Sequence, residues 1–128
     1  MTLEVIERAA TQTTPEIQGC PEQGLLRMKG DSYPENSFEL YGPILEWIEA
    51  ALIQGKPLLL ELRVAYMNTS SVKAMMDIFD LMEEAHQKGQ AVSVRWFYDP
   101  RNERVIEMVE EFKEDCTFAF DVLPDNQL

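Results

Sequence analysis

Three hydroxyl side chains in a row, Thr69, Ser70 and Ser71, follow Asn68 at a point where the sequence pattern changes from strand to helix. A Ser or Thr hydroxyl at the start of a helix accepts a hydrogen bond from an otherwise unpaired backbone N–H and so caps the helix. One hydroxyl is enough to cap the helix, so at least one of the three side chains is not needed as a cap. The unpaired N–H groups and the helix dipole also favour an anion here, so the run is either a cap alone or a cap with a site for a phosphate.

A strand and a helix flank the hydroxyl run. Residues 57–66 alternate between an apolar face and a face that carries Glu61 and Arg63, as in a β-strand. From Val72 the apolar residues recur at the spacing of an α-helix, which Gly89 closes. The buried face of this helix is expected to comprise Val72, Met75, Met76, Phe79, Met82 and His86, with a second apolar stripe of Ala74, Ile78, Leu81 and Ala85 beside it.

Further elements are expected on both sides of this unit. In order, they are a hairpin of strands 15–20 and 24–30, a helix up to Gly55, a strand over 91–98, a helix that Asp99 and Pro100 begin, and a strand over 117–122. Pro43 lies inside the first helical pattern, where proline removes a backbone donor. We therefore expect a kink at Pro43 or a helix that begins near Gly42 and Pro43.

The order of these elements, β-β-α-β-α-β-α-β, predicts an α/β fold with a mixed sheet. Charged residues recur on one face of both central strands, so the helices should cover mainly the other face. The chain is 128 residues long, which suits one domain. We expect a flexible N-terminal lead over residues 1–13, the domain over 14–123 and a short polar tail over 124–128.

The composition narrows the class of partner. The 23 acidic residues outnumber 11 basic ones and give a net charge of −12, which argues against nucleic acid or an anionic membrane and favours a basic protein partner. No apolar stretch is long enough for membrane insertion, and the N-terminus does not look like a signal peptide. Cys20 and Cys116 lie far apart and outside any metal-binding spacing. We expect a cytoplasmic protein with reduced thiols and with neither metal nor cofactor.

Three long segments resemble the SiaC family of bacterial regulatory phosphoproteins. They are residues 30–52, residues 58–86 with the NTSS corner, and residues 94–118. The resemblance covers about residues 14 to 123, which is nearly the whole chain. The sequence of strand, hydroxyl-rich corner and apolar helix is also similar to the STAS domains of anti-sigma-factor antagonists. The resemblance therefore implies a single STAS-like domain with helices mainly on one face of the sheet.

The SiaC resemblance also implies a function. It implies phosphorylation on Thr69, or less readily on Ser70 or Ser71, by a cognate Ser/Thr protein kinase, and resetting by a PP2C-type phosphatase. In its unphosphorylated form the protein is expected to bind and activate a diguanylate cyclase and so to control cyclic di-GMP signalling and biofilm formation. The corner has Asn68 where the wider STAS pattern has Asp, and no glycine follows the hydroxyls. This departure weakens the alternative of an anti-sigma-factor antagonist in a partner-switching module.

Basic residues are expected near the corner. Lys73 follows Thr69 by one helical turn, and Arg101 and Arg104 lie in the segment after the neighbouring strand. If the two strands are parallel, their carboxyl ends bring both segments to the same edge of the sheet. The three cations are either solvated surface charges or groups that guide the kinase and partly neutralise the phosphate.

The helix after the corner is more apolar than one buried side requires. Met75, Met76 and Phe79 are predicted to supply core and, together with Asn68 and Ser70, part of a docking surface for the partner. A phosphate on Thr69 would add about −1.5 to −2 charges beside this surface and block docking.

No enzyme motif accompanies these features. His86 lies near a helix end, and the acidic helix faces have the spacing of solvated surfaces. The sequence holds no nucleophile elbow, P-loop, dinucleotide fingerprint or metal motif, so we do not expect an enzyme. The alternative from another class is a small nucleotide-binding domain or enzyme that uses the Tyr33 to Ser37 loop together with the Thr69 corner.

Overall fold

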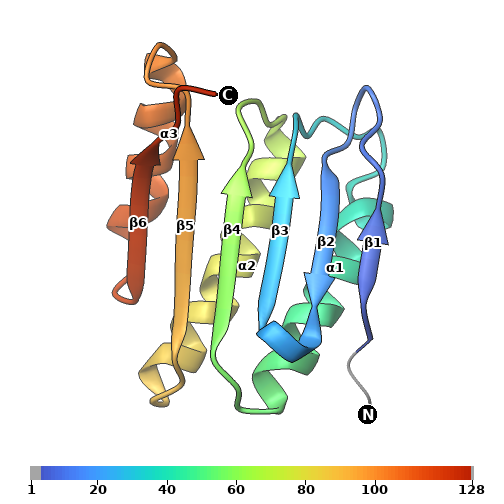
Figure 1. The fold of residues 1–128 in the computed structure, drawn as a ribbon, viewed down its shortest axis with the longest axis vertical. Coiled ribbons are helices and arrows are strands. Elements are labelled where there is room, and N and C mark those ends of the chain that lie inside the picture. The colour runs from blue at the N-terminus through green and yellow to red at the C-terminus, as the bar shows by residue number, and fades with distance from the viewer. Residues whose placement is uncertain (1–3, 128) are drawn as a thin grey trace.

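The computed structural model describes residues 4–127, which form one six-stranded sheet and three α-helices (Figure 1). The elements are β1 (Ile6–Arg8), β2 (Glu16–Cys20), β3 (Leu25–Lys29), α1 (Ser37–Ile53), β4 (Leu58–Arg63), α2 (Thr69–Gln87), β5 (Val92–Tyr98), α3 (Glu103–Glu114) and β6 (Ala119–Pro124), with a single 3-10 turn at Pro21–Gln23.

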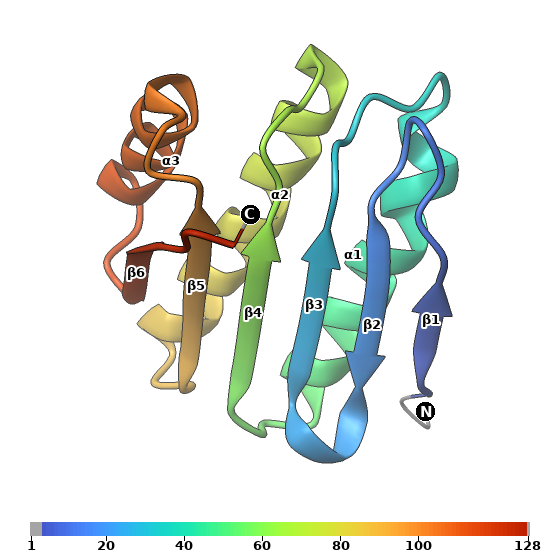
Figure 2. The same ribbon diagram turned by 45° about the horizontal axis from the view of Figure 1, so that its top comes forward.

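The sheet is mixed, as the sequence predicted. Its strands lie in the order β1-β2-β3-β4-β5-β6. β2 pairs antiparallel with β1 and with β3, and β3, β4, β5 and β6 run parallel to one another. All three helices pack on the same face of the sheet (Figures 1 and 2), so the expected one-sided cover is confirmed. The carboxyl ends of β3, β4 and β5 consequently meet at one edge, which positions the candidate site.

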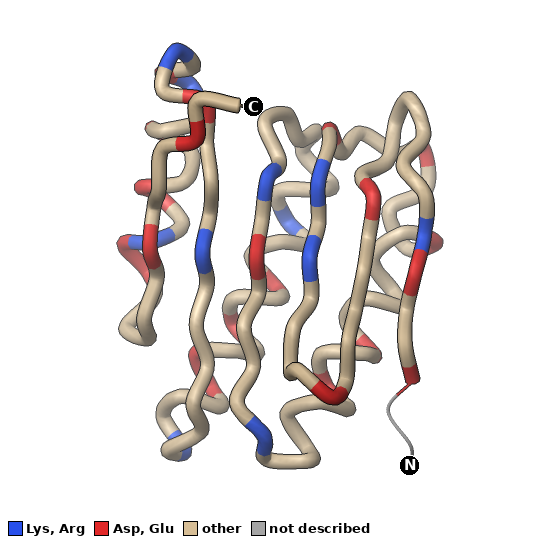
Figure 3. The backbone as a smooth tube through the Cα atoms, viewed as in Figure 1, with Lys and Arg blue, Asp and Glu red and all other residues tan. Residues whose placement is uncertain are grey.

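The other face of the sheet is not covered by helices, and charged side chains line it. The strand registers align Glu7, Gln18, Arg27, Glu61, Arg95 and Asp121 in one row across all six strands. Figure 3 shows the alternation of basic and acidic positions over the central strands. Within the row, Arg27 Nε lies 3.3 Å from Glu61 Oε1, and Arg63, two residues further along β4, places its Nη1 2.7 Å from the same oxygen. Each of these partly exposed ion pairs contributes at most about 1 kcal/mol to the stability of the fold. Together they give the uncovered face of the sheet a charged surface in which opposite charges are paired across strands.

The core lies between the sheet and the helices, and aromatic side chains pack its centre. Trp96 is fully buried and stacks on Phe112 at 5.7 Å between ring centroids. Phe79 packs edge-on against Phe112 and Phe120, in both cases at 5.3 Å. The indole Nε1–H of Trp96 donates a 3.2 Å hydrogen bond to the carbonyl of Val64, just beyond the end of β4. The aromatic centre therefore also fixes the chain that leads from β4 to the Thr69 corner.

The N-terminal segment differs from the expected flexible lead. Residues 1–3 lie outside the part of the chain that the structure describes, but Ile6–Arg8 forms the edge strand β1. Trp47 Nε1 donates a 2.7 Å hydrogen bond to the carbonyl of Glu4, which ties the segment to α1. The element order is therefore β-β-β-α-β-α-β-α-β. In the expected polar tail, Pro124 belongs to β6 and Leu128 lies outside the described residues.

The starts of α1 and α3 decide two expectations. α1 starts at Ser37, where the Asn36 side chain accepts hydrogen bonds from the next backbone N–H groups, and it continues through Pro43. Of the two alternatives for Pro43, a helix that begins near Gly42 and Pro43 was therefore wrong, and the buried stripe already begins at Leu40. α3 is capped by Asn102, whose Oδ1 accepts from the N–H of Val105 at 3.3 Å, and not by Asp99.

Glu83 on α2 holds the chain that enters β6. Its carboxylate accepts hydrogen bonds from the backbone N–H of Thr117 at 2.7 Å and from the Thr117 hydroxyl, and the Gln87 amide donates a further one at 2.6 Å. The Thr117 hydroxyl and N–H, followed by the Gln87 amide, lower the pKa of the Glu83 carboxyl from 4.5 to about 2. A carboxyl with a lowered folded-state pKa stabilises the fold above its unfolded-state pKa and loses that contribution as the pH falls through the folded-state value.

Glu83→Gln is therefore expected to remove part of the acid sensitivity of the fold. The free energy of unfolding of the wild type should fall between pH 4.5 and pH 2 by more than that of the variant, and the two should differ by a constant amount above pH 5. Urea unfolding at a series of pH values measures both curves. Parallel curves down to pH 2 would contradict this role of Glu83.

Candidate functional site

Asn68 organises the corner between β4 and α2. Its Oδ1 caps α2 by accepting a 3.0 Å hydrogen bond from the backbone N–H of Ser71. Its Nδ2 donates at 3.3 Å to the carbonyl of Pro34, in the loop between β3 and α1. The same two loops exchange backbone hydrogen bonds, since Ser32 N–H donates to the Tyr66 carbonyl at 2.8 Å and Asn68 N–H donates to the Ser32 carbonyl at 2.9 Å. The corner is therefore held by both its side chain and its backbone.

The three hydroxyls have different surroundings. Ser71 is fully buried, and its Oγ lies 2.9 Å from Ser32 Oγ, which in turn lies 2.6 Å from the Tyr41 hydroxyl. Ser70 is exposed, but its hydroxyl donates to Asn68 Oδ1 at 3.2 Å and accepts from the Ser37 hydroxyl. Thr69 is exposed, and its hydroxyl enters no hydrogen bond among residues 4–127. Thr69 is consequently the hydroxyl of the run that another molecule reaches without breaking a contact.

The buried hydroxyl chain joins α1 to α2 beneath the corner. Burial is the largest influence on Tyr41 and raises the pKa of its phenol, although the hydroxyls of Ser32 and Ser71 act in the opposite direction. Tyr41 therefore stays protonated at neutral pH, and the chain is a set of neutral hydrogen bonds. Each buried hydroxyl has a partner, so the chain fixes the two helices without leaving an unsatisfied polar group.

Two helix N-termini meet at this edge. The Ser37–Ser70 hydrogen bond joins the first turn of α1 to the first turn of α2. The positive ends of both helix dipoles are thus close together, and both favour negative charge in front of them. The arrangement suits an anionic group on Thr69, which is the first residue of α2.

The predicted cations have different positions. Lys73 is exposed one turn beyond Thr69, on the same side of α2. Arg101 forms a two-pronged ion pair with Asp99, in which Nε lies 3.0 Å from Oδ1 and Nη2 lies 2.9 Å from Oδ2. This pair lowers the pKa of Asp99 through hydrogen bonds from Arg101. Arg104 is exposed in the first turn of α3 and enters no salt bridge within the described part of the chain. Of the three cations, Lys73 is the one that shares a helix with Thr69.

The apolar residues predicted for docking separate into core and surface. Met75 is fully buried, so it belongs to the core and is not available to a partner in the folded protein. This corrects the prediction for Met75. Phe79 is 4% exposed and belongs mainly to the core, but it also lines a groove between α2 and α3. Met76 is 47% exposed, and its position seven residues after Thr69 puts it on the same side of α2.

Sequence reasoning named the Tyr33 to Ser37 loop only for an alternative function and did not assign three aromatic residues at the same edge to a docking surface. Tyr33 and Tyr66 lie on the loops before α1 and α2 and pack edge-on, with ring centroids 5.4 Å apart. Phe38, in the first turn of α1, is 89% exposed. We call Tyr33, Phe38, Tyr66 and Met76 the corner surface. Exposed aromatic and methionine side chains of this kind are typical of protein interfaces. In the sequence, the one feature that could have indicated this surface is the presence of large apolar residues at loop and helix-cap positions.

The described residues were also considered for a metal site, a membrane-spanning helix and a reactive thiol. No group of three or more His, Cys, Asp or Glu side chains among residues 4–127 is placed to hold a metal ion. Within the same residues, no helix has the length and hydropathy to cross a membrane. Cys20 and Cys116 are free thiols, and burial raises the pKa of Cys116 to about 11, so that this thiol stays protonated.

Comparisons with known proteins agree with the geometry. The family model described as SiaC family regulatory phosphoprotein matches residues 8–125. An uncharacterised protein of Pseudomonas aeruginosa (strain UCBPP-PA14) is 62% identical over 111 residues, which cover 86% of this chain and 88% of that protein.

Solved structures from Pseudomonas aeruginosa are similar over nearly the whole chain. One comes from the crystal structure of the diguanylate cyclase SiaD in complex with its activator SiaC, with 56% identity, a TM-score of 0.92 and coverage of 94% of this chain and 99% of that chain. Another is apo-SiaC, with 55% identity, a TM-score of 0.90 and coverage of 94% and 98%. Taken together, the matched family model and these relatives show that the chain belongs to the SiaC family of regulatory phosphoproteins.

Proposed function

We propose that this protein binds and activates a diguanylate cyclase while Thr69 is unmodified, and that phosphorylation of Thr69 ends the interaction. One observation carries the proposal: among residues 4–127, Thr69 has the exposed hydroxyl of the run without a hydrogen bond. The exposed side chains of the corner surface lie on the loops and first turns at the same edge and, with Met76, two turns further along α2. The relative SiaC is named as an activator in its complex with the cyclase SiaD, which supports the choice of partner.

The expected effect of the phosphate follows from its charge and hydration. A phosphothreonine carries about −1.5 to −2 charges at neutral pH and holds water strongly. Without a partner it would be stabilised by the two helix N-termini and by Lys73. Docking of an apolar partner surface would remove water from the dianion, and that cost opposes binding. The switch thus requires no change of fold, and the similar likeness to apo-SiaC and to SiaC bound to SiaD is in keeping with this.

The enzymes that set the switch are part of the proposal. A cognate Ser/Thr kinase would reach the Thr69 hydroxyl from solvent, while Ser71 is buried and Ser70 is engaged with Asn68 and Ser37. A PP2C-type phosphatase would remove the phosphate from the same exposed position. The protein is in this scheme a substrate and a regulator, and its partners do the chemistry.

SiaD from Pseudomonas aeruginosa provides a direct test. Adding the unphosphorylated protein to purified SiaD with GTP is expected to raise the rate of cyclic di-GMP formation and to give a stable complex in size-exclusion chromatography. Phosphosite mapping of the protein from its native cells should find phosphate on Thr69. No binding and no stimulation at micromolar concentration, together with an unmodified Thr69 in cells, would overturn the proposal.

A further inference from the structure

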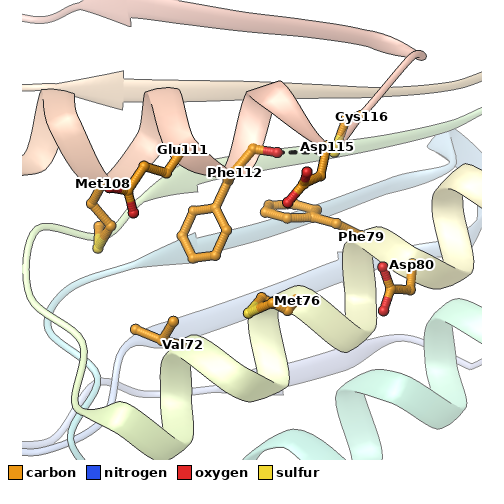
Figure 4. Close-up of a pocket in the computed structure, with 9 residues that line it drawn as sticks. All are labelled: Val72, Met76, Phe79, Asp80, Met108, Glu111, Phe112, Asp115 and Cys116. Atoms are coloured by element: carbon orange, nitrogen blue, oxygen red, sulfur yellow. Dashed lines mark hydrogen bonds between the residues drawn. The ribbon is translucent and has the colours of Figure 1, made fainter.

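A groove runs between α2 and α3 on the helix layer (Figure 4). The end nearest the start of both helices, at the left in Figure 4, is lined by the apolar side chains of Val72, Met76 and Met108. Val72 and Met76 follow Thr69 by three and seven residues, so they continue the side of α2 on which Thr69 lies. Met76 also belongs to the corner surface. The groove is therefore continuous with the surface proposed to bind the cyclase.

The floor of the groove is preformed. Phe79 and Phe112 line it, and their rings pack edge-on at 5.3 Å. Both rings are anchored from below, since Phe112 stacks on Trp96 and Phe79 packs against Phe120. The two floor residues are 4% and 7% exposed and are part of the core. A partner side chain would enter a rigid apolar depression and would not have to order a mobile one.

Acidic residues distinguish the far end of the groove. Asp80 on α2 and Asp115 after α3 lie at the end remote from Thr69, and Glu111 lines the rim of α3 between them and Met108. All three are exposed, and no salt bridge among residues 4–127 involves them. No lysine, arginine or histidine lines the groove. The groove thus carries Asp80 and Asp115 at the end remote from Thr69, whereas the end beside Thr69 is lined by apolar side chains, with the Glu111 side chain on its rim directed toward Met108.

We infer that this groove receives a segment of the cyclase in which large apolar side chains are followed by lysine or arginine. The inference rests on the proposed function and adds to it the chemistry and the direction of the bound segment. The apolar side chains would lie over Phe79 and Phe112, and the basic residues would face Asp80, Glu111 and Asp115. The acidic residues at the far end favour a basic segment over an uncharged or acidic one. At the other end, the groove continues into the corner surface, so one partner could contact both.

The polarity also fits the effect of phosphorylation. A basic segment placed along the whole groove would be attracted by a phosphate on Thr69, which would strengthen binding. In the inferred direction the apolar part of the segment lies nearest Thr69, while its basic part is held at the far end. The phosphate then meets apolar side chains that cannot replace its water, so binding is weakened.

Charge reversal at the rim tests the inference. The double variant Asp80→Arg/Glu111→Arg is expected to bind SiaD about tenfold or more weakly than the wild type, because like charges would then face each other. The matched control Asp77→Arg/Glu110→Arg changes the net charge equally on exposed positions of the same two helices, outside the groove lining. The control should bind within about twofold of the wild type. Isothermal titration calorimetry at two salt concentrations gives both the affinity and its salt dependence.

The outcomes separate this inference from the proposed function. Wild-type binding that weakens with added salt, with the salt dependence lost in the groove variant alone, supports the inference. Equal affinities of the groove variant and the control, whether both are high or both are reduced, overturn it while leaving the proposed function intact. Failure of the unphosphorylated wild type to bind SiaD is instead a failure of the proposed function. Thermal unfolding of both double variants confirms that each is folded.

Discussion

Thr69→Glu is expected to weaken binding to SiaD at least tenfold, a loss of about 1.4 kcal/mol, whereas Thr69→Ala should bind as the unphosphorylated wild type does. Glutamate places a permanent carboxylate at the first residue of α2, beside the apolar end of the groove and the corner surface. Docking would have to remove water from that charge. Alanine removes only a hydroxyl that makes no hydrogen bond within the part of the chain that the structure describes. Calorimetry and the rate of cyclic di-GMP formation measure the effect.

The stability of the Thr69→Glu variant provides the control. A carboxylate in the first turn of a helix is favoured by the helix dipole by about 0.3–1 kcal/mol, so the variant should be at least as stable as the wild type. Weakened binding together with unchanged or raised stability then identifies a blocked surface and not a damaged fold. Ser70→Glu is less suitable for comparison, because it would also break the hydrogen bonds with Asn68 and Ser37. Equal affinity of the glutamate, alanine and wild-type proteins would refute the switch.

Trp96→Ala is expected to lower the free energy of unfolding by about 3–5 kcal/mol. The side chain is fully buried, stacks on Phe112 and donates a hydrogen bond to the Val64 carbonyl. Its removal leaves a cavity under the floor of the groove and an unpaired carbonyl at the approach to the corner. Urea unfolding followed by circular dichroism measures the change.

Phe38→Ala is the matched aromatic control for that measurement. Phe38 is 89% exposed, so its removal should change the free energy of unfolding by no more than about 0.5 kcal/mol. The same substitution takes an aromatic side chain from the corner surface and should weaken binding to SiaD. Trp96 and Phe38 are thus expected to have opposite effects, one on stability and the other on binding. Similar stability losses in the two variants would contradict the assignment of Trp96 to the core centre.

Much of the fold was predictable because local patterns and tertiary packing agree. The alternation in residues 57–66 predicted the buried residues Leu58, Leu60, Leu62 and Val64, and the 3.6-residue spacing that follows predicted α2. The same alternation placed Tyr66 on the buried face, but β4 ends at Arg63 and Tyr66 is exposed. The charged second face of β4 and β5 predicted that the helices cover one side of the sheet. In each case the residue pattern repeats over several turns or strand positions, so that single exceptions do not hide it.

Other features depended on contacts that no local pattern contains. β1 exists through pairing with β2 and has only three residues, of which two are exposed. Asp99 and Asn102 are both suitable caps for α3, but the Asp99 carboxylate is occupied by Arg101. Met75 and Met76 are adjacent and chemically identical, yet one is in the core and the other is on the surface. The exposure of Phe38, and with it the corner surface, was likewise not encoded by spacing.

The uncovered face of the sheet offers a place for a reporter group. Arg95 is exposed there and lies between Glu61 and Asp121 in the row of alternating charges, on the opposite side of the sheet from α2 and α3. A fluorophore attached at this position through an introduced thiol, with Cys20 replaced, would stand clear of the helix layer. The proposed association with a cyclase, and its proposed reversal by a kinase, could then be tested continuously in solution by the anisotropy of one labelled protein.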